Sequence, residues 1–235
     1  MNYLNKEQFD LGAECQADAV LSTAVLARKA KQIEQQLSEL THTEDEQRTL
    51  LSHELASIQI ELEQGQLAWS NAMPAFKLHI TRQRWEQAIV ACDTLFRCNQ
   101  PDSLVALGHA LWLSITFPVE PTLTIAQLQH VIAETPEDSD GAAVAAAMAA
   151  YIVDLRGSEN ANDDAALAVG QMLNDVARRH GSVHNQDEFD RWFSKLELDQ
   201  PSKLLVRMRN IIDVLVQDQW WIDRDELQSN IPETG

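Results

Sequence analysis

Apolar residues of this chain recur at alternating intervals of four and three, which is the repeat of one face of an α-helix. The clearest series consists of Leu26, Ala30, Ile33, Leu37 and Leu40. A second series with the same spacing consists of Leu51, Leu55, Ile58 and Leu62. A short polar link joins the two series, so we expect them to run antiparallel as a helical hairpin within residues 1–66. The hairpin packs either within the chain or against a second copy, and the second arrangement would make the protein a homodimer.

Helical periodicity continues along the remainder of the chain, and no segment alternates apolar and polar residues as a β-strand does. The expected helices cover about residues 82–97, 104–115, 124–135, 142–155, 164–179, 186–196, 201–217 and 223–229. The polar segment 157–163 is the best candidate for a linker. We therefore predict an all-α protein with a hairpin (1–66), a middle region of helix pairs (67–156) and a C-terminal helical region (163–235).

Several residues predict where these helices begin or are interrupted. Thr43 and Thr124 each open a capping box, in which a hydroxyl and a carboxylate or amide satisfy free N–H groups. Two further starts are predicted by Asn185 with Glu188 and by Asp223 with Glu226. Pro74 lacks an N–H group and is expected to interrupt or kink the chain after Trp69.

The middle region carries a degenerate repeat. The segment Trp85-Glu86-Gln87-Ala88-Ile89 is followed by Pro101-Asp102 and then by Leu107-Gly108. Pro101 and Pro136 lie 35 residues apart (136 − 101), a period typical of helical solenoids. Together with Trp69-Ser70-Asn71-Ala72, these residues resemble the tetratricopeptide repeat family over about residues 67–155.

In that family an aromatic and a small residue open the second helix of a unit, a proline ends it, and a Leu-Gly pair marks the next unit. The chain departs from this pattern in the spacing from Pro101 to Gly108, which is short, and from Trp69 to Trp85, which is long. The second unit also lacks the aromatic residue and the Leu-Gly pair. The resemblance implies a stacked helical array with a groove that binds peptides or proteins, as adaptors and secretion or assembly chaperones do.

The charge of the chain restricts its partners. Thirty-six acidic residues against 18 basic ones give a net charge of −18. Binding to nucleic acid relies on Lys and Arg that displace counterions from phosphates, so direct nucleic-acid binding is disfavoured. A basic protein or an amphipathic helix is the expected partner.

Targeting and redox features are sparse. The sequence has no signal peptide pattern and no apolar run of about 20 residues for a membrane span. Cys15, Cys92 and Cys98 are too few for a disulfide framework. We expect a cytoplasmic protein with reduced thiols and no membrane association.

Motifs that would carry chemistry are weak. His180 and His184 have the spacing of a zinc pair, but Gly181 and Ser182 lie between them and no third ligand stands at a recognised position. Asp138-Ser139-Asp140-Gly141 resembles part of a calcium loop, but Pro136 and Ala147 fall where the loop needs carboxylates. We therefore predict no metal and no cofactor.

Arg179 and His184 match the Arg-x4-His pattern of one class of helical ribonucleases, in which the pair polarises a phosphate and moves a proton. A solvated helix end explains the same two residues, and the acidic surroundings oppose RNA. No other constellation resembles a catalytic site, so we predict that the protein is not an enzyme.

The candidate partner-binding residues lie near the C-terminus. Trp220 and Trp221 follow an apolar helix, and adjacent tryptophans do not easily share one buried face. Exposed aromatic residues and arginines are enriched in interface hot spots. Lys203, Arg207 and Arg209 form a small basic island on an acidic chain. The alternative is that one tryptophan closes the core and the basic side chains are solvated.

Three functions are compatible with these features. The first is a non-enzymatic adaptor or chaperone that holds a protein partner on a helical-repeat surface. The second is an acidic mimic that occupies the nucleic-acid site of a basic protein. The third is a helical ribonuclease that uses Arg179 and His184.

Overall fold

The computed structural model describes residues 6–40, 45–137, 139–156 and 162–229 of the chain, with side chains from residue 22 onward except residues 162 and 163. These residues form eleven α-helices and no strand, which confirms the predicted all-α class. In chain order the helices are α1 (Lys6–Glu39), α2 (Asp45–Glu61), α3 (Gly65–Thr81), α4 (Trp85–Arg97), α5 (Ser103–Thr116), α6 (Pro121–Glu134), α7 (Gly141–Arg156), α8 (Asn162–Gly181), α9 (Gln186–Lys195), α10 (Pro201–Val216) and α11 (Arg224–Ser229).

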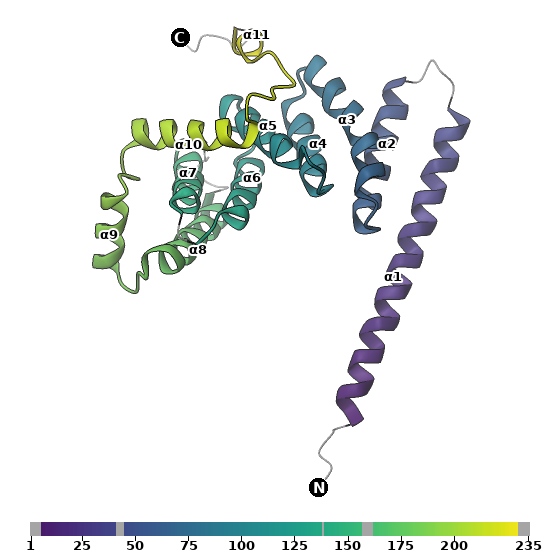
Figure 1. Ribbon diagram of the computed structural model, residues 1–235, viewed down its shortest axis with the longest axis horizontal. Coiled ribbons are helices and arrows are strands. Elements are labelled where there is room, and N and C mark those ends of the chain that lie inside the picture. The colour runs from purple at the N-terminus through teal and green to yellow at the C-terminus, as the bar shows by residue number, and fades with distance from the viewer. Residues whose placement is uncertain (1–5, 41–44, 138, 157–161, 230–235) are drawn as a thin grey trace.

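The first two helices form the expected hairpin within the chain. Its apolar seam contains the buried side chains of Ala30, Ile33, Leu55 and Ile58. The guanidinium of Arg48 donates to the carbonyl oxygens of Leu37 (3.0 Å) and Leu40 (2.6 Å), so it satisfies acceptors at the end of α1. Figure 1 shows that α1, with 34 residues, extends far past the end of α2, which has 17.

Helices α2 to α8 form an array in which each helix packs against the next. The even-numbered helices α2, α4, α6 and α8 also contact one another in sequence. Helices α3, α5 and α7 begin at residues 65, 103 and 141, which are 38 residues apart in both steps (103 − 65 and 141 − 103). This regular interval and the packing of neighbouring helices are compatible with a helical repeat.

Small residues let these helices approach closely. Alanines at positions 68, 72, 75, 88, 91, 106 and 110 are fully buried. Gly65 begins α3 where α4 ends, and a Cβ atom there would overlap the carbonyl oxygen of Cys98. The next turn is held by Ser103, whose hydroxyl accepts from the N–H of Gln100 (2.8 Å) and donates to the carbonyl of Leu95 (3.0 Å).

Two expectations about helix boundaries are wrong. Pro74 does not interrupt the chain, since helix α3 runs from Gly65 to Thr81 and continues through it while packing on both neighbouring helices. Helix α6 begins at Pro121, whose fixed φ suits the first turn. Thr124 therefore lies inside α6 instead of at its start, and its buried hydroxyl donates to the carbonyl of Ser114 (3.2 Å).

Two predicted helix starts are confirmed. The side chain of Asn185 accepts from the N–H of Glu188 (3.0 Å), and the carboxylate of Glu188 accepts from the N–H of His184 (2.8 Å). Asp223 accepts from the N–H of Glu226 (3.0 Å). The capping box at Thr43 and most of the predicted linker (157–161) lie outside the described residues.

No described helix combines the length and the apolar content that crossing a lipid bilayer requires.

Candidate partner-binding surface

Helix α10 lies across the array and packs on α5 and α7 (Figure 1). Its buried face consists of Leu204, Met208, Ile212 and Val216. Gly108 of α5 makes the close approach possible, because a Cβ atom there would overlap the side chain of Val216. The glycine of the Leu107-Gly108 pair thus accommodates α10, a helix more than 90 residues further along the chain.

The chain after α10 is held by Trp220 and Trp221. The Trp221 ring stacks on His109 with 4.5 Å between ring centroids and meets the edges of Trp69 (5.9 Å) and Phe76 (5.7 Å). The Trp220 ring lies 5.0 Å from His109. Both tryptophans are partly buried, so the expectation that they cannot share one buried face is wrong. They follow the end of α10 at Val216 in a non-helical segment, which lets both rings reach one histidine.

His109 anchors this segment from the centre of α5. It is fully buried, its Nδ1 lies 2.8 Å from the carbonyl oxygen of Val105, and its Nε2 lies 2.9 Å from the backbone nitrogen of Trp221. Since the Trp221 N–H is a donor, Nε2 must accept, and the neutral ring carries its proton on Nδ1. The pKa of His109 is lowered to about 4, chiefly by burial and also by the nearby Arg224, while the hydrogen bond to Val105 acts in the opposite direction.

The predicted basic island is mostly neutralised by acidic neighbours. Lys203 pairs with Glu197. Arg207 donates to a carboxylate oxygen of Asp140 (2.9 Å) and to the carbonyl of Leu196 (2.6 Å). Arg209 is exposed and forms no ion pair among the described residues. The structure therefore leaves one of the three cations, Arg209, without an acidic partner.

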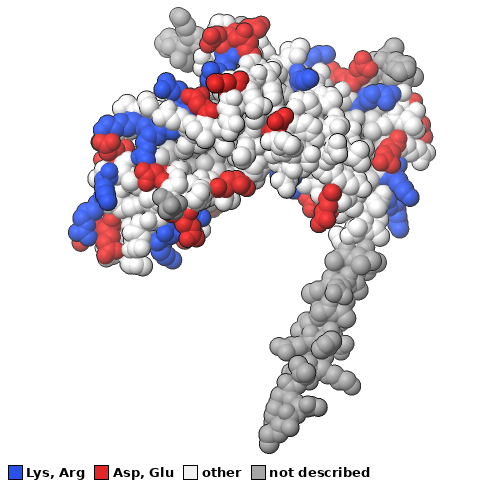
Figure 2. All heavy atoms as spheres, viewed as in Figure 1, with Lys and Arg blue, Asp and Glu red and all other residues white. Residues whose placement is uncertain are grey.

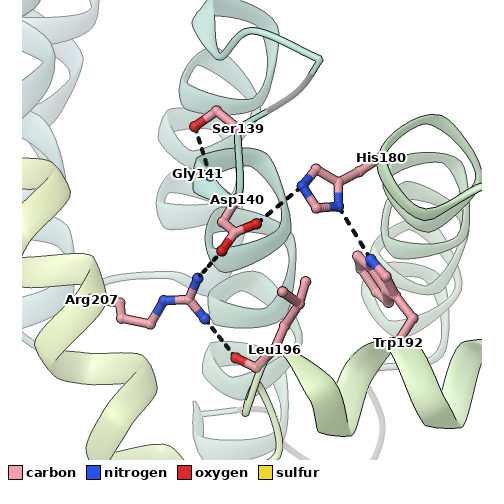
Figure 3. A network of polar contacts seen from close by, with 7 residues as sticks. All are labelled: Ser139, Asp140, Gly141, His180, Trp192, Leu196 and Arg207. Carbon is pink, nitrogen blue, oxygen red and sulfur yellow. Dashed lines mark hydrogen bonds and ion pairs between the residues drawn. The ribbon is translucent and has the colours of Figure 1, made fainter.

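Asp140, at the start of α7, joins four elements of the C-terminal half (Figure 3). One carboxylate oxygen contacts Arg207 of α10, and the other lies 3.2 Å from Nε2 of His180 at the end of α8. The indole N–H of Trp192 in α9 donates to Nδ1 of His180 (3.2 Å). This set of contacts fixes α9 and α10 relative to α7 and α8, so it is structural in character.

Two grooves flank α10. The first, which we call the α11-side groove, has a volume of about 500 Å³ and lies between α5, α10 and α11. Its walls carry Trp112, Ile115 and Leu205 together with the charged side chains of Arg209, Asp213, Arg224 and Asp225. Arg224 lies 4.1 Å above the Trp220 ring and 4.0 Å from Asp213. The sequence-predicted residues Trp220 and Arg209 thus lie beside or in this groove.

The second, the α6-side groove, has a volume of about 370 Å³ and lies between α5, α6, the start of α7 and α10. Its walls are mostly aliphatic and include Leu104, Leu107, Val131, Ile211, Val214 and Leu215. Leu104 is 44% exposed and Val214 is 70% exposed. This groove was not predicted from the sequence. The sequence feature that could have revealed it is Val214, an apolar residue on the outer face of the α10 helix, where a polar residue is usual.

The motifs considered for chemistry do not assemble into a site. Among the described residues no group of three His, Cys, Asp or Glu side chains could hold a metal ion. His180 is engaged by Asp140 and Trp192, whereas His184 is exposed beyond the end of α8. The guanidinium of Arg179 donates to the carbonyl of Ile132 (3.2 Å), and Arg178 instead lines a shallow pocket of about 260 Å³ with His184.

The two described cysteines are unsuited to nucleophilic chemistry. Cys92 and Cys98 are both buried and free. Burial raises the pKa of the Cys98 thiol to about 11 and raises the pKa of Cys92 well above its ordinary value. The reactive thiolate is therefore scarce at neutral pH at both positions.

The surface around α10 thus combines one mostly aliphatic groove, one groove of mixed lining, partly buried tryptophans and one exposed arginine without an ion pair among the described residues. Its features come from α5, α6, α10 and α11, which are distant in sequence. Comparisons with protein-family models, with curated proteins and with solved structures found no match.

Proposed function

We propose that the protein is a non-enzymatic adaptor or chaperone that holds a protein partner on a surface of tetratricopeptide-like helix pairs. The observation that carries the proposal is the ridge formed by α10, which has a groove of mixed apolar and charged lining on one side and a mostly aliphatic groove on the other. Grooves between packed helices are sites where proteins take up side chains of a partner.

Exposed aliphatic residues gather at this ridge. Leu205 is 42% exposed in the α11-side groove, and Leu104 and Val214 are exposed in the α6-side groove. Val206, 49% exposed, lies on the outer surface of α10 between the two grooves. Apolar side chains that cluster on a surface favour contact with another protein, whereas isolated ones carry no such meaning.

The helix array supports the same function. Helices α3, α5 and α7 repeat at a constant interval, and each packs on its neighbours with small residues between them. In repeat proteins each unit contacts only its neighbours, so the array presents an extended surface on which partners bind. The tetratricopeptide-like pattern of residues 67–155 belongs to this proposal.

Affinity purification of the full chain from a native lysate tests the proposal. An unrelated acidic protein of similar pI serves as the control bait, because a net charge of −18 attracts basic proteins without a specific site. We expect at least one protein to be enriched with this chain and not with the control. Enrichment of the same basic proteins by both baits, or of none, would contradict the proposal.

The acidic mimic is the alternative that the net charge favours. Figure 2 shows acidic and basic side chains interspersed around the visible face, with a mostly uncharged area over α3, α4 and α5. A mimic of a nucleic acid needs a continuous acidic surface, so this face supports the adaptor better. Salt distinguishes the two. The affinity of a mimic for its partner falls steeply between low and physiological ionic strength, whereas the affinity of a partner held mainly by apolar contacts falls less steeply.

A further inference from the structure

The α6-side groove has the lining of a docking site for side chains. Leu107 and Val131 form part of its floor and are buried, whereas Leu104 and Val214 stand at its edges and are exposed. None of its lining residues is aromatic, and Glu134 is its one charged residue. Burial of the exposed parts of Leu104 and Val214 against a partner would favour binding.

Charge at the groove is negative. Glu134 is exposed and forms no ion pair with any described residue. Three further exposed carboxylates lie within three residues of lining residues along the chain: Asp102 two residues before Leu104, Glu137 directly after Pro136, and Asp218 three residues after Leu215. None of the three forms an ion pair among the described residues.

Among the described residues, no cation lines this groove. Arg207 is held by Asp140 and by the carbonyl of Leu196, and Arg179, which reaches the end of α6 from α8, donates to the carbonyl of Ile132. Arg209 is exposed and unpaired within the described part of the chain, but it lines the α11-side groove on the other side of α10. The unpaired charge in the lining of the α6-side groove is therefore the negative charge of Glu134.

The form of the partner follows from what the groove lacks. The described residues contain no β-strand, so there is no sheet edge to which a partner could add a strand. Proline-rich segments dock in grooves lined by aromatic side chains, and this lining has none. An amphipathic helix that inserts aliphatic side chains at i, i+3 or i+4 and i+7 is the remaining common mode, and it suits an aliphatic groove between helices.

We propose that the α6-side groove binds an amphipathic helix of a partner protein whose aliphatic face enters the groove and whose flanking Lys or Arg side chains meet Glu134. The proposal rests on the protein-binding function above and specifies its surface and the chemistry of its partner.

A model helix tests this proposal directly. The peptide has Leu on one face and Lys on the others, carries a fluorophore, and is compared with a peptide in which Glu replaces each Lys. Fluorescence anisotropy with the full chain measures both affinities. We expect the Lys peptide to bind at least tenfold more tightly than the Glu peptide.

Substitutions at the edges of the α6-side groove test whether the Lys peptide binds there. Leu104→Gln combined with Val214→Gln removes the exposed aliphatic edges, and Leu67→Gln combined with Val90→Gln is the matched control. Leu67 and Val90 are 56% and 45% exposed and lie outside the lining of both grooves. All four side chains are exposed, so folding is expected to be retained, and circular dichroism checks it. We expect the first pair to weaken binding of the Lys peptide about tenfold and the control pair to change it less than twofold.

The charge at the rim is tested separately. Glu134→Gln should weaken binding of the Lys peptide about threefold. Glu34 is an exposed glutamate of α1, and Glu34→Gln should leave this binding unchanged. Equal weakening by both pairs of apolar substitutions, or no binding of the Lys peptide, would overturn the proposal. A lysate partner that co-purifies equally with the wild-type chain and with the Leu104/Val214 variant would also overturn the proposal that the partner binds in this groove. The proposed adaptor function would not be affected by that result.

Discussion

The helix array and the C-terminal segment of this protein are held in place in different ways. Of the 14 residues of α5, 11 are buried, whereas α10 buries four of its 16 residues and α9 buries Trp192 among its 10. The array is held by continuous apolar packing of small and aliphatic side chains. The segment from α9 to α11 is held by the narrower apolar face of α10 and by specific contacts made by Asp140, His109 and Gly108. The effect of losing one contact should therefore be spread over the whole array. In the C-terminal segment, the loss of one contact should instead free only the part that this contact holds in place.

The largest expected effect is a cavity in the array. Leu111 of α5 is fully buried, and Leu111→Ala should reduce the free energy of unfolding by about 3 kcal/mol. Leu205, 42% exposed on α10, is the matched control, and Leu205→Ala should cost less than about 0.5 kcal/mol. Urea unfolding followed by circular dichroism measures both. Similar losses in the two variants would show that the array is no better packed than the ridge.

Protonation of His109 should have an effect of similar size, directed at the C-terminal segment. The folded pKa of about 4 lies below the ordinary value of about 6.5, so the unfolded chain binds the proton more tightly. The contribution of this group is complete above pH 6.5 and is lost as the pH falls through 4, for a total of about 3 kcal/mol.

His109→Gln is the control for that pH dependence, because glutamine can accept the Trp221 N–H bond and does not titrate. Burial also lowers the pKa values of His53 and His79, so both proteins should lose some stability on acidification. We expect the wild type to lose more than the variant between pH 6.5 and 4 in urea unfolding. Parallel pH profiles would show that the Trp221 contact does not depend on neutral His109.

The same contrast explains how much of the structure the sequence could predict. Apolar spacing and caps such as Asn185 with Glu188 are local, so they predicted the helix class, the hairpin and most helix positions. The partner-binding surface around α10 could not be predicted from local signals. It depends on contacts between distant parts of the chain, such as Gly108 with Val216 and His109 with Trp221. Local signals also failed at Pro74 and Thr124, where packing and a neighbouring proline determine the backbone.

Two glycines, one at a helix–helix contact and one on an open helix face, test the tight packing of α10 on the array. A Cβ atom at Gly108 would overlap Val216 of α10, whereas a Cβ atom at Gly170 of α8 would meet no atom within 4 Å. Gly108→Ala should therefore destabilise the protein by about 2 kcal/mol, since α10 must shift. Gly170→Ala should stabilise it by about 0.5 to 1 kcal/mol, because alanine favours a helix interior. Thermal unfolding of the two variants checks the opposite signs, and a stabilising Gly108→Ala would mean that α10 does not pack tightly on α5.

The smallest expected effect concerns Asp140. Its side chain is 49% exposed, and Asp140→Asn weakens the contacts to Arg207 and His180 without removing the side chain. We expect a loss of about 1 kcal/mol in the free energy of unfolding, because partly exposed ion pairs are screened by water.

The structural effect of Asp140→Asn should be local. Hydrogen exchange should quicken in α9 and at the start of α10, whose positions depend on Asp140, and stay unchanged in α3 to α5. Asp154→Asn, at an exposed site on α7, is the control. Faster exchange throughout the array would mean that the C-terminal segment and the array unfold as one unit, and the contrast between the two regions would then be wrong.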